Sequence, residues 1–254
     1  LIPIALKIIN YRETFLPKTF VATIGFFDGV HAGHRFLLQI LKDEASRLGK
    51  KSLVISFQAH PKSVLSADTT PPLLTLNEEK IELLSEFGID ACVLLPFDKE
   101  MAALSAYDFF KQLIFPLGVG TLFIGFNHRF GKNRAEGIND YIRYGQELGI
   151  TIQEASSFTL DTEKVSSSII RNLIENGQLQ KAATFLSYPY FLKGKVVSGN
   201  KIGNTIGFPT ANIELADCSK LLPPNGVYAV TVEVQKNRYW GMLNIGYKPT
   251  IGPN

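Results

Sequence analysis

The sequence is poor in cysteine and in net charge, and both shortages exclude classes of protein. Of its 254 residues only Cys92 and Cys218 are cysteines, and they show no C-x-x-C spacing. This argues against a disulfide framework and against a zinc site. The net charge is only +3, without a block of basic residues, whereas nucleic-acid binding normally requires a strong basic stripe. We therefore expect small anionic molecules as partners and no nucleic acid.

The sequence also lacks a long unbroken apolar run. The longest, Leu113–Phe126, contains Pro116 and three glycines, and it is too short to span a bilayer. The apolar start Leu1–Ile9 includes Lys7 and has no small-residue cleavage site, so a first strand explains it better than a signal peptide. These shortages predict a cytoplasmic protein without a membrane partner, and they leave the oligomeric state open.

The most informative stretch that is present runs from Ile24 to His34 and reads I-G-F-F-D-G-V-H-A-G-H. It follows the apolar run Phe20–Ile24, which predicts a buried strand, and precedes Arg35–Leu48, whose apolar residues recur at helical spacing. Its glycines let the backbone approach a ligand, and the N–H groups of a helix start favour phosphate. His31 and His34 would lie on the same side of the first turn, where they can stabilise charge during displacement at phosphorus. A plain strand-to-helix turn with a polar cap is the alternative.

Strands and helices alternate along most of the chain. Further strands are predicted at Lys51–Phe57, Ala91–Phe97, Val119–Ile124 and Ile150–Gln153. Further helices are predicted at Asn77–Phe87, Ala106–Ile114, Asp140–Leu148, Ser167–Glu175 and Gln178–Leu186. This alternation predicts an α/β fold with a parallel sheet covered on both faces. In such sheets ligands bind at the carboxyl ends of the strands, where the strand order reverses.

The pattern changes after residue 186. From Tyr190 onward the chain has short alternating runs and no helical pattern, which predicts an antiparallel barrel or sandwich. Lys236 and Asn237 form a plausible hairpin turn between two such runs. We therefore expect two domains, at residues 1–186 and 187–254.

Two other predicted strand ends carry polar side chains. His60 and Pro61 follow the strand Lys51–Phe57, and the proline would end that strand. The segment Gly125–Arg134 follows Val119–Ile124 and combines glycines, an amide, aromatic rings and three cations, as expected where a phosphate lies beside a flat ring. A histidine without a role and a solvated basic loop are the respective alternatives.

Two segments later in the chain suit nucleotide phosphates. Val165–Arg171 (V-S-S-S-I-I-R) joins hydroxyl groups, a helix start and a guanidinium, a set that can bind a triphosphate, although serine is also a common plain N-cap. In Gly199–Ile213 glycines recur every four residues before P-T-A-N. Such a loop suits a nucleotide with magnesium, although the glycines alone could mark bends in a barrel.

These motifs resemble two enzyme families. The stretch G-F-F-D-G-V-H-A-G-H resembles the H-x-G-H motif of the nucleotidyltransferase superfamily, in the form found in bacterial FAD synthetases. Val165–Arg171 is similar to the motif I-S-S-T-x-I-R, with Ser168 in place of threonine. Gly125–Arg134 is similar to G-x-N-F-x-F-G-x-x-R, with His128 where phenylalanine is more usual. Gly199–Ile213 is similar to the riboflavin kinase signature ending in G-F-P-T-A-N.

The order of these motifs resembles that of the bacterial bifunctional riboflavin kinases and FMN adenylyltransferases. The resemblance implies a Rossmann-like nucleotidyltransferase domain followed by an all-β riboflavin-kinase-like barrel. It also implies adenylyl transfer from ATP to FMN, giving FAD and pyrophosphate, and ATP-dependent phosphorylation of riboflavin to FMN, with Mg²⁺. The family's proposed glutamate base lies beyond the point where this chain stops, at Asn254, so we expect the barrel to be incomplete.

The resemblance also assigns roles to residues of this sequence. The catalytic residues would be His31, His34 and Arg171. ATP and phosphate would be bound by Gly25, Phe26, Asp28, Gly33, Ser167 and Ser168. The flavin would be bound by His60, Pro61, Asn127, Arg129 and Phe130. In the kinase domain, ATP would be bound by Gly199, Gly203, Gly207, Thr210 and Asn212, with Mg²⁺ at Thr210.

Two other functions remain open at this stage. One is a catalytically silent module that binds flavin or nucleotide, and the other is a nucleotidyltransferase for a different phosphorylated acceptor. The presence of His31, His34 and Arg171 favours an enzyme over a silent module, and the kinase-like tail favours a flavin acceptor.

Overall fold

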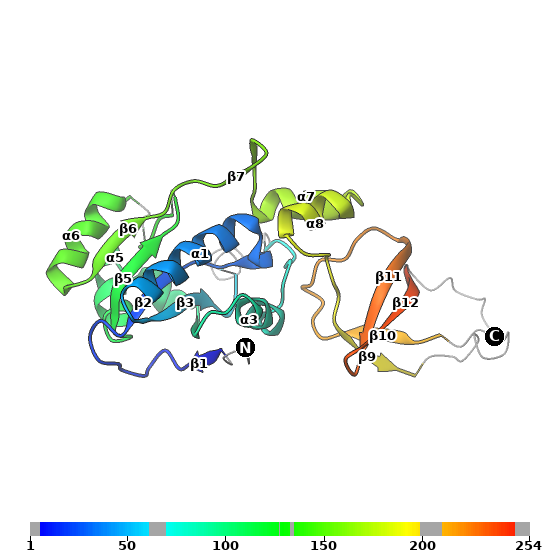
Figure 1. The fold of residues 1–254 in the computed structure, drawn as a ribbon, viewed down its shortest axis with the longest axis horizontal. Helices are drawn as coiled ribbons and strands as arrows, with labels where there is room; N and C mark the ends of the chain where they lie inside the picture. Colours follow the sequence, from blue (N-terminus) through cyan, green and yellow to red (C-terminus); the bar gives the residue numbers. More distant parts are fainter. Residues whose placement is uncertain (1–5, 61–69, 127, 133–134, 199–209, 247–254) are drawn as a thin grey trace. The chain divides into compact units, whose positions relative to one another are not determined.

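The computed structural model describes residues 6–60, 70–126, 128–132, 135–198 and 210–246. The chain divides into two compact units, Leu1–Ser167 and Ser168–Asn254, and each is described by itself. Figure 1 labels helices and strands of both, where there is room. The expected domain boundary after residue 186 differs from this division by the length of two helices, and it stays a prediction.

The first unit is built on a six-stranded parallel sheet. Its strands are β1 (Lys7–Ile9), β2 (Phe20–Ile24), β3 (Lys51–Phe57), β4 (Ala91–Leu95), β5 (Val119–Ile124) and β6 (Thr151–Glu154). They lie in the order β1-β4-β3-β2-β5-β6, and every neighbouring pair is parallel. From β2 the chain moves first to β3 and β4 on one side and later to β5 and β6 on the other. The carboxyl end of β2 therefore lies where the strand order reverses, which is the expected ligand position.

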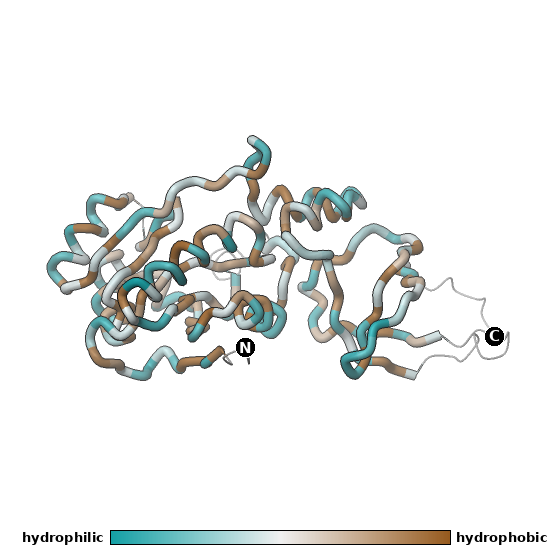
Figure 2. The backbone as a smooth tube through the Cα atoms, in the orientation of Figure 1, coloured by the Kyte–Doolittle hydropathy of each residue, from teal (hydrophilic) through white to brown (hydrophobic). Residues whose placement is uncertain are grey.

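Helices cover this sheet, whose inner strands β2, β3 and β5 are buried at every residue except Lys51. The helical elements are η1 (Asp28–Val30), α1 (Ala32–Arg47), α3 (Asn77–Glu86), α4 (Lys99–Ala103), α5 (Ala106–Phe109), the π-helical η3 (Phe110–Ile114) and α6 (Ile138–Leu148). Ile24 and Ile55 belong to a core cluster with α5, η3 and α6. Successive strand residues point to opposite faces, and α1 contacts β2 and β3. Figure 2 shows hydrophobic and hydrophilic residues mixed along α1 and α6, as expected for helices between core and solvent.

Most predicted elements are confirmed, and the differences have local causes. The predicted bounds of β2, β3 and β5 agree with the structure. Helix α1 begins at Ala32 rather than at Arg35, because His31 caps it with its side chain. The predicted helix Ala106–Ile114 continues from α5 into the π-helical η3, which no sequence signal indicated.

The second unit contains helices and antiparallel strands; the strands were predicted there, whereas both helices were predicted as part of the first domain. Helix α7 (Ser167–Glu175) begins at the division between the units, and α8 (Leu179–Leu186) follows. The strands are β9 (Gly194–Val197), β10 (Asn212–Leu215), β11 (Gly226–Val234) and β12 (Asn237–Ile245). β9 pairs with β10 and β11 with β12, both antiparallel. Two short strands of the first unit, β7 (Thr159–Leu160) and β8 (Glu163–Lys164), also form an antiparallel pair.

The predicted hairpin turn at Lys236 and Asn237 is wrong by one residue. Gln235 and Lys236 form the turn, with φ of +50° and +69°, and Asn237 is the first residue of β12. A two-residue hairpin needs positive φ at both turn positions, which normally favours asparagine or glycine. Here the pairing of β11 with β12 overrides that preference.

Candidate active site

The glycine-rich turn after β2 is a strained connection into α1. It holds two residues other than glycine in the left-handed region, Phe27 with φ of +54° and Val30 with φ of +36°. A β-branched residue at positive φ is unusual, and such strain persists only where surrounding contacts impose it. The turn must therefore be held from outside.

Asp28 is the residue that holds the turn. Its carboxylate is buried and accepts hydrogen bonds from the backbone N–H of Thr75 (2.9 Å) and of Leu74 (3.2 Å), just before α3. Thr75 Oγ1 in turn accepts a hydrogen bond from the Gly29 N–H at 2.9 Å. From the far side, Ser167 Oγ donates to the backbone carbonyl of Asp28 at 3.0 Å. These contacts give Asp28 and Ser167 a structural part in the site, and their contact with ATP stays a prediction.

The turn places His31 and His34 side by side at the start of α1. Their rings are stacked, with centroids 3.6 Å apart and planes at 16°. The Nδ1 atom of His31 accepts a hydrogen bond from the His34 N–H at 3.3 Å, so a neutral His31 carries its proton on Nε2. The His34 ring also meets the ring of Phe27 edge-on at 5.0 Å. Two imidazoles at a helix N-terminus form a site that favours phosphate.

The electrostatics of the pair keep His34 neutral near pH 7. Burial lowers the pKa of His34 well below its ordinary value, and the nearby His31 and Lys80 lower it further. Two like charges about 4 Å apart repel by about 4 kcal/mol at an effective dielectric constant of 20, so the stacked rings resist double protonation. A neutral His34 can still donate a hydrogen bond to a phosphate oxygen.

Lys80 of α3 is a buried cation beside this site that the sequence interpretation missed. Its ammonium group donates to Ser56 Oγ (3.2 Å) and to the Phe57 carbonyl (3.4 Å), and it lies 4.2 Å from the centroid of the Phe26 ring. A signal was present, because Lys80 stands three and four residues before the buried Leu83 and Leu84, on the same helix face.

The other residues expected near the turn are close to it. The ring of His60, after β3, meets the Phe26 ring edge-on with centroids 4.7 Å apart. Gly33 lies against His31, since a Cβ atom there would approach the imidazole to 3.3 Å. A Cβ atom on Gly25 would approach the Phe27 ring to 3.1 Å. The structure thus brings Gly25, Phe26, Gly33 and His60 together with the two histidines, whereas Pro61 lies outside the described residues.

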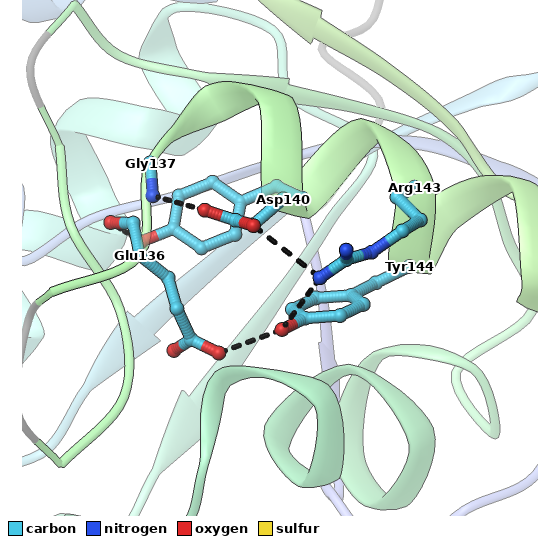
Figure 3. Close-up of polar contacts among 6 residues, drawn as sticks. Glu136, Gly137, Asp140, Arg143 and Tyr144 are labelled. Carbon is cyan, nitrogen blue, oxygen red and sulfur yellow. Dashed lines mark hydrogen bonds and ion pairs between the residues drawn. The ribbon is translucent and has the colours of Figure 1, made fainter.

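The segment after β5 is held by contacts with α6 and by contacts between its own residues. Tyr141 of α6 accepts a hydrogen bond from the Phe130 N–H (2.8 Å) and donates to the Glu136 carbonyl (3.0 Å). The Phe130 ring is buried in the core, and the Arg129 guanidinium donates to the Glu136 carbonyl at 3.0 Å. Figure 3 shows Tyr144 bonded to the Glu136 carboxylate close by. Phe130 and Arg129 thus support the segment; their flavin contacts stay predictions, and Asn127 is outside the described residues.

The remaining predicted residues belong to the second unit. Arg171 and Ser168 lie on α7, and each unit is described by itself, so their place relative to the histidine pair stays a prediction. Thr210 is exposed just before β10, and Asn212 is the first residue of β10. Gly199, Gly203 and Gly207 lie outside the described residues.

Comparison with known proteins decides the family. The model of the FAD synthetase family matches residues 15–169, which is most of the first unit. This chain belongs to the FAD synthetase family. The model of the riboflavin kinase family matches residues 186–254, so the order of the two halves agrees with the expectation from the motifs.

Members of the FAD synthetase family with both halves are similar to this chain over most of its length. The bifunctional riboflavin kinase/FMN adenylyltransferase of Bacillus subtilis is 39% identical over 235 residues, 91% of this chain and 73% of that protein. The protein of the same description from Escherichia coli K12 is 36% identical over 233 residues, 91% of this chain and 74% of that protein. A crystal structure described as a macrolide-efflux protein from Streptococcus pneumoniae has a TM-score of 0.86 and 29% identity, covering 97% of this chain and 81% of that one. Among the residues described in our structure, no helix is long and apolar enough to cross a membrane.

Proposed function

We propose that this FAD synthetase family member transfers the adenylyl group of ATP to FMN, giving FAD and pyrophosphate. The observation that carries the proposal is the stacked pair His31 and His34 at the start of α1, at the carboxyl end of β2 where the strand order reverses. The activity is that of the curated relatives, whose description names FMN adenylyltransferase. We follow that description rather than macrolide efflux because both matched family models name flavin enzymes.

The reaction is a direct displacement at the α-phosphorus of ATP. A phosphate oxygen of FMN attacks that phosphorus, the new P–O bond forms, and the bond to the bridging oxygen of pyrophosphate breaks. His31, with its proton on Nε2, and the neutral His34 donate hydrogen bonds to the oxygens on which negative charge increases. The N–H groups at the start of α1 add to this stabilisation. No covalent enzyme intermediate is needed.

The proposal includes Arg171 and Mg²⁺ as further sources of positive charge. Arg171 would bind the triphosphate together with the hydroxyls of Ser167 and Ser168. Mg²⁺ supplies neutralisation of the triphosphate charge when bound. The described residues contain no group of three or more His, Cys, Asp or Glu that could hold a metal ion. In the first unit, Mg²⁺ would therefore be held chiefly by the phosphate oxygens of ATP.

For the second half we propose ATP-dependent phosphorylation of riboflavin to FMN. The match to the riboflavin kinase model over residues 186–254 supports this. Thr210 and Asn212 offer a hydroxyl and an amide oxygen, which are donors that suit Mg²⁺. We propose domains at residues 1–186 and 187–254, small flavins and nucleotides as partners without nucleic acid, and the cytoplasm as the location.

The test is to supply the chain with ATP, Mg²⁺ and either FMN or riboflavin, and to separate the flavins by chromatography. FAD formed from FMN supports the adenylyltransferase assignment. FMN formed from riboflavin supports the kinase assignment. The absence of both products, with flavin and ATP still bound, would instead favour a silent binding module.

A further inference from the structure

Lys80 links three parts of the candidate active site. It comes from α3, and its side chain is fully buried. Its ammonium group donates to Ser56 Oγ and to the Phe57 carbonyl at the end of β3. Ser56 Oγ in turn donates to the backbone carbonyl of Phe26 at 3.0 Å. Lys80 thus reaches the glycine-rich turn through Ser56, and its charge lies over the Phe26 ring as well.

Packing alone does not explain a buried ammonium group with such neighbours. Its acceptors are a hydroxyl and a carbonyl oxygen, and burying a charge is unfavourable unless strong partners compensate. Methionine would fill similar space without this cost. The unfavourable free energy of burying this charge is reflected in the pKa of Lys80, which burial lowers to about 8. A function for the charge is the simpler explanation.

The charged and titratable groups around Lys80 come from four elements. Asp28 of η1 favours its protonated form, while burial raises the pKa of Cys92 of β4 to about 12, so this thiol is uncharged at neutral pH. Glu79, beside Lys80 on α3, accepts a hydrogen bond from the Leu76 N–H. The nearby charges of His31 and Lys80 both oppose protonation of His34 on α1.

We propose that Lys80 is a positioning residue for adenylyl transfer, whose buried ammonium group holds Phe26 in place through Ser56 and carries a positive charge beside the histidine pair. This inference rests on the proposed function. When ATP and FMN bring negative phosphates to the histidine pair, those phosphates favour protonation of His34. The fixed charge of Lys80 opposes it, so His34 stays a neutral donor and the stacked rings do not become two adjacent cations.

The first experiment measures the charge of His34 without any substrate. The chain contains only four histidines, so the ¹⁵N signals of the His34 ring can be assigned by replacing each in turn and followed against pH. Lys80→Met should raise the His34 titration midpoint, whereas Lys80→Arg should leave it low. The matched control is Lys42→Met, because Lys42 also donates to a backbone carbonyl, that of Phe87 at 2.7 Å. A midpoint that is the same in the wild type and in Lys80→Met would overturn the inference.

The second experiment follows FAD formation from FMN and ATP against pH. Lys80→Met should lower kcat about tenfold or more at pH 7 while KM for ATP changes less than about threefold. The wild type should lose activity above about pH 8, and Lys80→Arg should retain it there because arginine stays charged. A Lys80→Met variant as active as Lys42→Met would overturn the inference. If the wild type forms no FAD, the proposed function fails, while the His34 titration still tests the role of Lys80. If Lys80→Met does not fold, the activity that Lys80→Arg retains at basic pH tests that role instead.

Discussion

The two units of this chain differ most in how they use their strands. All five residues of β2 in the first unit are buried, and β2 has a paired strand on each side. In the second unit, β11 and β12 pair with each other, and no third strand joins them among the described residues. Trp240 and Met242 on β12 are 89% and 85% exposed. A lone two-stranded pair cannot bury both faces of its side chains.

This difference shows in which unit the predicted site is supported by observed contacts. In the first unit the candidate active site rests on a closed set of buried contacts, from Asp28 to Thr75 and from Lys80 to Ser56. Of the residues predicted to bind nucleotide in the kinase half, Thr210 is exposed before β10, Asn212 begins β10, and Gly199, Gly203 and Gly207 lie outside the described residues. Changes at these contacts of the first unit should therefore alter catalysis and stability together, whereas changes in the segment that matches the riboflavin kinase model should act on riboflavin phosphorylation.

The largest effect is expected for His31→Ala. It removes one donor to the transition state and the cap of α1, so FAD formation from FMN should fall about 10²- to 10³-fold. The control is Gln39→Ala on the same helix, which removes only an exposed hydrogen bond to Asp43. FAD formation near the wild-type rate in His31→Ala would contradict the account of the histidine pair.

Thr210→Ala should separate the two activities. Because Thr210 lies in the segment that matches the riboflavin kinase model, FAD formation from FMN should stay within about twofold of the wild type. Phosphorylation of riboflavin should fall about tenfold or more, since a hydroxyl that suits Mg²⁺ is lost. The two rates are measured by chromatography of the flavins, and equal losses in both would mean that the sites are not separate.

The pH dependence of the free energy of unfolding should reveal the buried charge of Lys80. Its pKa is about 8 in the folded chain and about 10.4 in an unfolded one. Between these values the unfolded state binds more protons, so the free energy of unfolding should rise with pH, by on the order of 3 kcal/mol from this group. Urea unfolding from pH 7 to 10.5 should show this rise in the wild type relative to Lys80→Met, and parallel curves would contradict it.

Asp28→Asn should loosen the strained turn. The substitution replaces one carboxylate oxygen by an NH₂ group, which cannot accept from the N–H of Leu74 or Thr75, so the free energy of unfolding should fall by about 1 to 3 kcal/mol. The matched control is Asp43→Asn on the exposed face of α1, which should change it by less than about 0.5 kcal/mol. Equal urea midpoints for the two variants would show that Asp28 does not hold the turn.

Much of the first unit could be predicted from sequence, because its signals are local. The mostly apolar runs of β2, β3 and β5 indicated their bounds, and H-A-G-H after a strand indicated the site. The start of α1 was missed because histidine is not a usual N-cap, and only the 3.3 Å contact of His31 Nδ1 with the His34 N–H reveals it.

The residues that were missed depend on contacts between distant segments. A lysine on an amphipathic helix normally lies at the surface, and Lys80 is buried because the glycine-rich turn and the end of β3 meet α3 there. Likewise the hydroxyl of Tyr141 holds the segment around Phe130 and Glu136, a contact that the sequence analysis did not predict. The contacts of Asp28 with Leu74 and Thr75 span more than forty residues, so no local pattern predicts them.

The central claim is tested most directly by following the α-phosphate of ATP. The wild-type chain is supplied with Mg²⁺, FMN and ATP labelled at the α-phosphorus, and the label is traced through the separated products. The account predicts labelled FAD and one unlabelled pyrophosphate released for each FAD formed. FMN that remains unchanged while ATP is consumed, or label that never enters a flavin, would contradict adenylyl transfer by this chain.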